Sequence, residues 1–205
     1  MYVSFLILGF GCFFHVVTKG VLIRNVVLCR EGTYSIVRHP YYMANYLIDS
    51  SFCLLSGNLY LVLIYPFLFY WAYGPTIRKE ERFLASMYGD RFLQYSLEIP
   101  QIFPDPSSIG CWKELARGFS RQRITRNELS RFVRFMATAS CIMFTHAIRT
   151  QSLVDIQHFF RVKNDYRMEV LLVVTVMLYA LSFVMQNHKP HDTVDKPRSS
   201  SGIAP

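Results

Sequence analysis

The apolar stretch YMANYLIDSSFCLLSGNLYLVLIYPFLFYWAYG, residues 42–74, decides the fold of this chain. It is about twice as long as the shortest membrane-spanning helices, which have about 17 residues. Ser56, Gly57 and Asn58 interrupt it near its middle, and small or polar residues of this kind are typical of turns. We therefore predict two antiparallel membrane helices joined by an uncharged turn at residues 56–58.

Three further apolar stretches flank this hairpin. Residues 2–18 predict a first membrane helix that ends at Lys19. We prefer a retained helix to a secretory signal peptide, because no basic segment precedes the stretch and no small-residue cleavage site follows it. Residues 133–148 and 168–186 predict a second hairpin towards the C-terminus. The expected fold is all-α, a polytopic transmembrane helical bundle of about five spans with a cytoplasmic interfacial helix.

The composition favours a membrane protein. Hydrophobic residues make up 52% of the chain and the mean hydropathy is +0.21, while only 18% of residues are charged, against about 25% in ordinary globular domains. The 13 Tyr and 17 Phe suit a bilayer interface. Disordered, collagen-like and coiled-coil classes are excluded. The five cysteines are scattered without a close pair, so we predict neither a disulfide framework nor a metal site.

Basic residues are unevenly distributed and predict the orientation of the chain, whose formal net charge is +8. Residues 19–38 contain four Lys or Arg and residues 75–134 contain eleven, whereas the turn at 56–58 has none and the loop at 149–167 has four. Lys and Arg gather in cytoplasmic loops of membrane proteins. The two basic segments and the C-terminal tail are therefore expected to face the cytoplasm.

The second half of the long basic segment, up to Arg134, interleaves apolar and basic residues. We expect it to be an amphipathic helix on an anionic bilayer surface. Nucleic-acid binding is not expected, because membrane helices flank this segment and it has no recognition motif. The chain thus divides into residues 1–41 (first span and cytoplasmic connector), 42–104 (hairpin and core of the site), 105–132 (basic interfacial segment), 133–187 (C-terminal hairpin) and 188–205 (disordered tail).

Two polar clusters lie at the predicted cytoplasmic ends of the first hairpin. The first contains Gly32, Tyr34, Arg38, His39, Pro40, Tyr41 and Tyr42, and the second contains Arg78, Lys79, Glu80, Glu81 and Arg82. Antiparallel helices bring these ends to the same side of the membrane, where they can form one site. The simpler alternative is a basic and aromatic interface with a proline at a helix start. For the two glutamates the simpler alternative is a solvated helix start paired with Arg78 and Lys79, which is weaker because acidic residues close to the cytoplasmic side of the membrane do not serve orientation.

The run GTYSIVRHPYY, residues 32–42, resembles the signature of membrane-embedded methyltransferases typified by isoprenylcysteine carboxyl methyltransferase and the phospholipid methyltransferases. The residues that resemble the second block of this family are Glu80, Glu81, Leu84, Tyr88, Gly89, Asp90, Tyr95, Pro100 and Pro104. The resemblance covers residues 32–104. It implies that S-adenosylmethionine binds in a cytoplasm-facing pocket and that the acceptor is an amphiphilic lipid or a prenylated or otherwise lipidated molecule.

The resemblance also implies roles for individual residues. The expected cofactor-binding residues are Gly32, Tyr34, His39, Tyr42, Glu80 and Glu81, and the expected catalytic residues are Arg38, His39, Arg78 and Glu81. The chemistry agrees, because carboxylates suit an ammonium or ribose hydroxyls, a cation suits a carboxylate, and aromatic rings suit a sulfonium or adenine. O-methylation of a carboxylate or phosphate needs only a cation such as Arg38 or Arg78. N-methylation of an amine also needs a base, such as His39 or a glutamate.

Some alternatives remain open at this point. Asp49, inside the hairpin, is either a further base or a partner in a helix–helix hydrogen bond. An NADPH-dependent membrane reductase of the sterol or steroid type also contains an Arg-His-Pro-like step and a Tyr-Gly turn. Its members usually have a further His or Trp-Tyr cluster downstream, which this chain lacks. The glutamate pair also favours a methyl donor over the reductase. A non-catalytic membrane scaffold is the third possibility.

Overall fold

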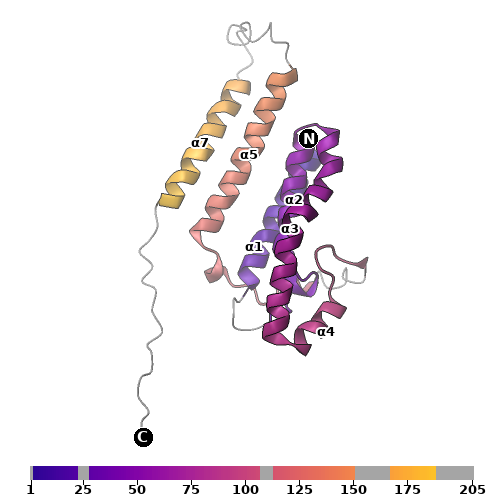
Figure 1. Ribbon diagram of the computed structural model, residues 1–205. Helices are drawn as coiled ribbons and strands as arrows, with labels where there is room; N and C mark the ends of the chain where they lie inside the picture. The colour runs from indigo at the N-terminus through magenta and orange to yellow at the C-terminus, as the bar shows by residue number, and fades with distance from the viewer. Residues whose placement is uncertain (1, 23–27, 107–112, 151–166, 188–205) are drawn as a thin grey trace.

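The computed structural model describes residues 2–22, 28–106, 113–150 and 167–187, and within these ranges its elements are helices without a strand (Figure 1). The predicted all-α class is confirmed for this part of the chain. The predicted tail at 188–205 lies outside the described residues.

The hairpin predicted at residues 42–74 is present. Helix α2 (Pro40–Leu55) and helix α3 (Leu59–Tyr88) are joined by the predicted turn at residues 56–58. Pro40 is the first residue of α2, where a proline loses no helical hydrogen bond. The Asn58 side chain accepts a hydrogen bond from the Tyr60 backbone N–H at 3.0 Å and so caps the start of α3.

The two helices of the hairpin are also linked inside the apolar region. The Tyr65 hydroxyl on α3 donates a hydrogen bond to Asp49 Oδ2 on α2 at 2.8 Å. Of the two roles considered for Asp49, the helix–helix hydrogen bond is the one that the structure contains. It satisfies a polar side chain that would otherwise be costly among apolar neighbours.

Helix α1 (Tyr2–Val21) includes the predicted first span and packs along α2. The two helices approach closely because Gly11 lies against Ile48. A Cβ atom at Gly11 would come within 2.9 Å of the Ile48 side chain. Phe14 on α1 is fully buried with Met43 of α2 and Phe69 of α3 in the same core cluster. The helices α1, α2 and α3 therefore form one bundle (Figure 1).

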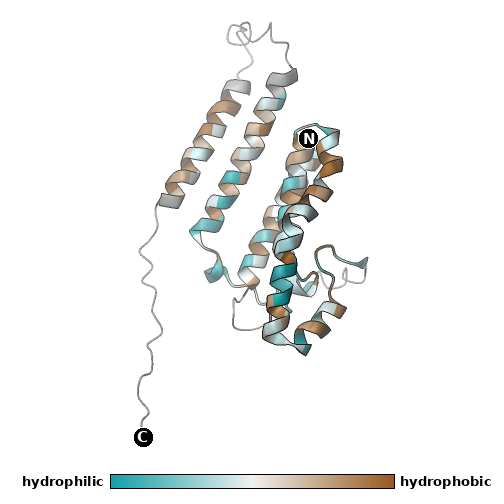
Figure 2. Ribbon diagram, in the orientation of Figure 1, coloured by the Kyte–Doolittle hydropathy of each residue, from teal (hydrophilic) through white to brown (hydrophobic). Residues whose placement is uncertain are grey.

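Helix α3 extends beyond its apolar part and ends in a sharp turn. Figure 2 shows mostly hydrophobic residues in the upper part of the bundle and hydrophilic residues in the lower part of α3. Gly89 follows α3 with φ +54°, a backbone conformation that favours glycine. Helix α4 (Asp90–Glu98) then turns back at the lower end of α3 (Figure 1). The second polar cluster is thereby placed outside the apolar layer.

Two of the described helices, α1 and α3, are long and apolar enough to cross a membrane. Helix α2 has 16 residues, and the apolar part of helix α7 (Arg167–Asn187) is Val170–Met185. A membrane-embedded bundle is compatible with these helices, whereas a bundle of about five complete spans stays a prediction. Fewer helices than predicted are long and apolar enough to span a membrane, because α2 is short and because charged residues occupy the first turns of α5 (Arg126–Thr150).

The prediction of a continuous amphipathic helix within the basic segment is wrong. Turns and the short 3₁₀-helix η3 (Arg121–Arg123) precede α5, which begins only at Arg126. Arg123 Nη1 donates hydrogen bonds of 2.9–3.0 Å to the carbonyls of Gly20, Val21 and Gly118. The last carbonyls of a helix have no partner within it. This segment therefore folds back to cap the end of α1.

The second predicted hairpin is present as two packed helices, although the connecting residues 151–166 lie outside the described part. Ser130 Oγ on α5 donates a hydrogen bond to the Ser182 carbonyl on α7 at 3.1 Å, and the Thr138 and Tyr179 hydroxyls are 3.3 Å apart. In Figure 1, α5 lies between α7 and the bundle of α1, α2 and α3. Helix α5 thus contributes side chains both to α7 and to the bundle.

Candidate active site

A cavity of about 530 Å³ lies among the helix ends. Its lining comes from α1, α2, α3, α4, α5 and the short 3₁₀-helix η1 (Gly32–Ser35). This volume falls in the range of about 300–1,000 Å³ that is common for small-molecule sites. The polar and aromatic lining residues that matter most here are Tyr34, Arg38, His39, Tyr42, Glu80 and Arg131.

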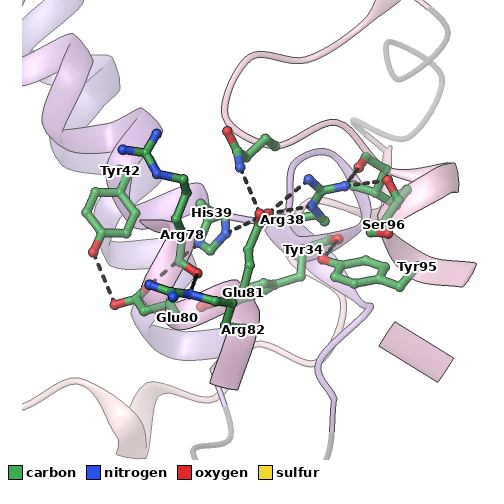
Figure 3. A network of polar contacts seen from close by, with 12 residues as sticks. Tyr34, Arg38, His39, Tyr42, Arg78, Glu80, Glu81, Arg82, Tyr95 and Ser96 are labelled. Atoms are coloured by element: carbon green, nitrogen blue, oxygen red, sulfur yellow. Dashed lines mark hydrogen bonds and ion pairs between the residues drawn. The ribbon is translucent and has the colours of Figure 1, made fainter. Parts of the chain in front are cut away.

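Glu81 is the centre of a polar network beside this cavity (Figure 3). Its Oε1 atom lies 3.1 Å from Arg38 Nε, 2.9 Å from Arg38 Nη2 and 3.2 Å from His39 Nε2. Its Oε2 atom accepts a hydrogen bond from Gln101 Nε2 at 2.9 Å. Both carboxylate oxygens therefore have protein partners, and Glu81 is not among the residues that line the cavity.

Each guanidinium nitrogen of Arg38 also has a protein partner. Its Nη1 atom donates hydrogen bonds to the carbonyls of Ser96 and Ile99, the latter at 3.0 Å. The backbone N–H of Arg38 also donates to the Pro100 carbonyl at 2.8 Å. These bonds tie the segment after α4 to the residues that begin α2. The two blocks of sequence that carry the family resemblance thereby meet at one place.

Glu80 behaves differently from its neighbour, because successive residues of a helix point in different directions. The Tyr42 hydroxyl donates a hydrogen bond to Glu80 Oε1 at 3.1 Å, and His39 Nδ1 lies 3.6 Å from Glu80 Oε2. The Glu80 side chain is 50% exposed, against 20% for Glu81, and it lines the cavity. His39 therefore bridges an open carboxylate and an enclosed one.

Aromatic rings enclose the same region. The Tyr42 ring makes edge-on contacts with His39 and Tyr73, with ring centroids 5.8 Å and 5.4 Å apart. The Tyr95 hydroxyl on α4 donates a hydrogen bond to the Tyr34 carbonyl at 2.7 Å. Burial raises the pKa of the Tyr34 and Tyr95 phenols, so both stay neutral at physiological pH.

Two of the predicted site residues have other surroundings. Gly32 has φ +60°, and a Cβ atom there would come within 2.8 Å of the Arg117 carbonyl and of the Val21 side chain. Gly32 therefore allows close packing and does not line the cavity. The Arg78 side chain extends away from the Glu81 carboxylate in Figure 3 and does not line the cavity either.

Four residues that sequence analysis did not single out complete the site. Gln101 holds Glu81, and a second polar group is formed by His15 of α1 with Glu128 and Arg131 of α5. His15 and Arg131 line the cavity. A signal existed for His15, because the apolar stretch 2–18 contains no Asp, Glu, Lys or Arg and no other His. Arg131 and Glu128 had no comparable signal, since they belong to a generally basic segment.

Comparison with known proteins gives two partial matches, while no family model and no solved structure matches the chain. The chain is 30% identical over 81 residues to protein-S-isoprenylcysteine O-methyltransferase of Schizosaccharomyces pombe, which covers 40% of this chain and 34% of that protein. It is 33% identical over 81 residues to the cobalt-zinc-cadmium resistance protein CzcN of Cupriavidus metallidurans, covering 40% of this chain and 37% of that protein.

The match spans only about a third of the length of either relative. The two relatives support a distant relationship between this chain and the isoprenylcysteine methyltransferases. The match to the Schizosaccharomyces pombe protein gives weak support to a methyltransferase activity and leaves its class open.

Proposed function

We propose that this chain is an integral membrane methyltransferase that transfers a methyl group from S-adenosylmethionine to a lipid or lipidated acceptor, with its site facing the cytoplasm. The observation that carries the proposal is the position of His39, which lies within 3.6 Å of Glu80 and 3.2 Å of Glu81 at a cavity with aromatic walls. A basic and aromatic membrane interface alone would not require two carboxylates at this point.

The residues present fit S-adenosylmethionine. Glu80 offers a half-exposed carboxylate for an ammonium group or ribose hydroxyls. Tyr42 and Tyr73 offer ring faces, and electron-rich rings attract a cation such as a sulfonium. The cavity volume of about 530 Å³ suits a ligand of this size.

Bound S-adenosylmethionine would supply an electrophilic methyl group. A lone pair of the acceptor oxygen or nitrogen forms the new bond to that carbon, while the electron pair of the broken carbon–sulfur bond stays on sulfur. The chain's residues align the two reactants and exclude water. Glu80, Tyr42 and His39 act at the cavity. Glu81 acts through His39 and Arg38, so it is a positioning residue.

The test is incubation of membranes that contain the full chain with S-adenosylmethionine labelled in its methyl group. We expect label in extracted lipid or in lipidated protein, and release by mild base would identify a methyl ester rather than a methylated amine. A parallel binding assay with labelled NADPH tests the reductase alternative. Absence of S-adenosylmethionine binding by the solubilised chain would refute the proposal.

A further inference from the structure

The cavity has a second polar group, which we call the arginine wall: His15 on α1 with Glu128 and Arg131 on α5. Arg131 Nη1 lies 3.1 Å from His15 Nε2 and 3.2 Å from Glu128 Oε2. The His15 and Glu128 residues are buried, with 1% and 7% exposure, whereas the Arg131 side chain is 41% exposed. Two buried groups therefore hold one end of a guanidinium that remains open to the cavity.

The hydrogen-bond donors of Arg131 determine the arrangement of the arginine wall. A guanidinium only donates hydrogen bonds, so His15 Nε2 accepts from it and the proton of the neutral imidazole resides on Nδ1. That Nδ1 atom lies 3.8 Å from Glu128 Oε2, too far for a hydrogen bond, and within the described part of the chain both atoms are buried without a hydrogen-bond partner. His15 and Glu128 thus orient Arg131 through its Nη1 atom. Within the described part of the chain, the Nε and Nη2 atoms of Arg131 have no recorded partner.

The arginine wall and the neighbouring Lys19 together carry an excess of positive charge. Glu128 is the only carboxylate in it, and it interacts with both Arg131 and Lys19, whose Nζ atom is 3.8 Å from Glu128 Oε1. One positive charge is left over. Arg38, the other arginine that lines the cavity, has all three guanidinium nitrogens bound to Glu81 or to carbonyls. Among the lining arginines of the described chain, Arg131 is therefore the one with two guanidinium nitrogens that lack a protein partner, and its side chain is 41% exposed against 13% for Arg38.

We propose that Arg131 binds the anionic head of the acceptor, a carboxylate or a phosphate on an apolar chain, while the Glu80 side of the same cavity takes the methyl donor. This inference rests on the proposed function. Open guanidinium nitrogens suit the two oxygens of such a head group. Leu22, Leu28 and Phe83 also line the cavity and provide contacts for an apolar chain. His15 and Glu128 are positioning residues for Arg131.

The first experiment measures binding to the full, detergent-solubilised chain. The probes are an N-acetyl-S-prenylcysteine and its neutral carboxamide, and, for the phosphate source, phosphatidic acid and the matching diacylglycerol. We expect at least one acid to bind about tenfold more tightly than its neutral partner, because a charge-assisted contact is lost in the latter. The Arg131→Gln variant should lose this preference. The Arg126→Gln variant, with its exposed arginine on the same helix, should keep it.

A second variant, Glu128→Gln, should strengthen the binding of the acidic probe instead of weakening it. Glu128 competes with the ligand for Arg131, so Glu128→Gln should tighten binding of the acid and leave binding of the neutral probe unchanged. Arg131→Lys should restore part of the preference, since it returns the charge without the planar group. Glu128→Gln retains the Arg131 side chain, its contact with His15 and a carbonyl acceptor at position 128, so it tests the proposal even if Arg131→Gln does not fold.

Labelled S-adenosylmethionine binding separates this inference from the proposed function. We expect Arg131→Gln to change its Kd less than about twofold, since the donor side of the cavity keeps its groups. Equal binding of acids and neutral partners by the wild-type chain would overturn the inference, as would loss of S-adenosylmethionine binding in an Arg131→Gln variant that is folded. If the acid preference is present but the wild-type chain does not bind S-adenosylmethionine, the proposed function fails and the anion site remains.

Discussion

The Glu81 network and the arginine wall lie on the same cavity but differ in how completely the protein satisfies their charges. Both carboxylate oxygens of Glu81 have protein partners, and so do all three guanidinium nitrogens of Arg38. Arg131 uses one nitrogen and is 41% exposed. A saturated network holds segments of the chain together, whereas open donors are available to a ligand. The comparison teaches that Glu81 and Arg38, although they belong to the motif, mainly hold the site together. Arg131, whose donors are less completely used, is available to a bound ligand.

The largest expected effect comes from breaking the saturated network. His39→Ala and Glu81→Ala should each reduce methyl transfer at least about hundredfold, because alignment of the reactants is lost. Membrane insertion should be unchanged. Glu81→Ala should also lower the free energy of unfolding by about 1–3 kcal/mol, since Arg38 and Gln101 lose their acceptor.

The measurements for these variants are label transfer from S-adenosylmethionine, membrane fractionation and chemical unfolding in detergent. His146→Ala is a matched control, because His146 lies near Gly57 at the turn of the first hairpin. Wild-type transfer rates in both His39→Ala and Glu81→Ala would contradict the assignment of the site.

A smaller effect should separate Glu80 from Glu81. Glu80→Gln should raise the Kd for S-adenosylmethionine about tenfold, because it removes a charge that faces the cavity. It should leave the unfolding temperature nearly unchanged, since the side chain is 50% exposed and its contacts within the described chain are the Tyr42 hydroxyl and His39 Nδ1 at 3.6 Å. Equilibrium binding and thermal unfolding measure the two effects.

Glu114→Gln is the control for Glu80→Gln, because Glu114 is an exposed residue whose ion pair is with Arg117, away from the cavity. If Glu80→Gln destabilised the fold and Glu81→Ala did not, the contrast between an open and an enclosed carboxylate would be wrong.

The smallest effect should come from loosening the connection between α1 and the segment that leads to α5. Arg123→Ala removes three hydrogen bonds to carbonyls, two of them at the end of α1, and should cost about 1–2 kcal/mol in unfolding free energy. It should weaken the preference for acidic acceptors by about twofold to threefold while S-adenosylmethionine binding is retained, because it precedes the helix that carries Arg131.

Arg121→Ala serves as the control for Arg123→Ala, since the Arg121 side chain is exposed and in the same 3₁₀-helix. A larger change in S-adenosylmethionine binding than in acceptor preference would show that Arg123 supports the Glu81 network rather than the arginine wall.

Local signals in the sequence predicted much of the helical framework. Residues 42–74 have the length and the central interruption of a hairpin, and the structure has its turn at residues 56–58. Pro40 predicted a helix start, and α2 begins there. These features depend on residues only a few positions away in the sequence, so they could be predicted from the sequence alone. The grouping of Arg38 and His39 with the glutamate pair followed from antiparallel helices and needed no side-chain detail.

Other features depended on contacts between distant residues. The segment before α5 has the composition of an interfacial helix, but Arg123 finds the open carbonyls of Gly20 and Val21 about a hundred residues earlier. Gln101 meets Glu81 only because Arg38 holds the carbonyls after α4. Arg78 was expected to act as a cation at the site, yet its side chain extends away from the Glu81 carboxylate and does not line the cavity.

The sequence by itself determined that the chain is helical and apolar, that a hairpin begins at Pro40 and that one arginine–histidine pair and one glutamate pair lie at the same end of it. Periodicity, capping and hydropathy are local properties, so they can be derived from a single chain. Only the tertiary structure decided that Glu81 is enclosed, that Glu80 faces the cavity and that Arg131 joins it from α5. Whether a charged side chain finds partners within the protein depends on all the groups packed around it. The packing of the helices determines which groups these are.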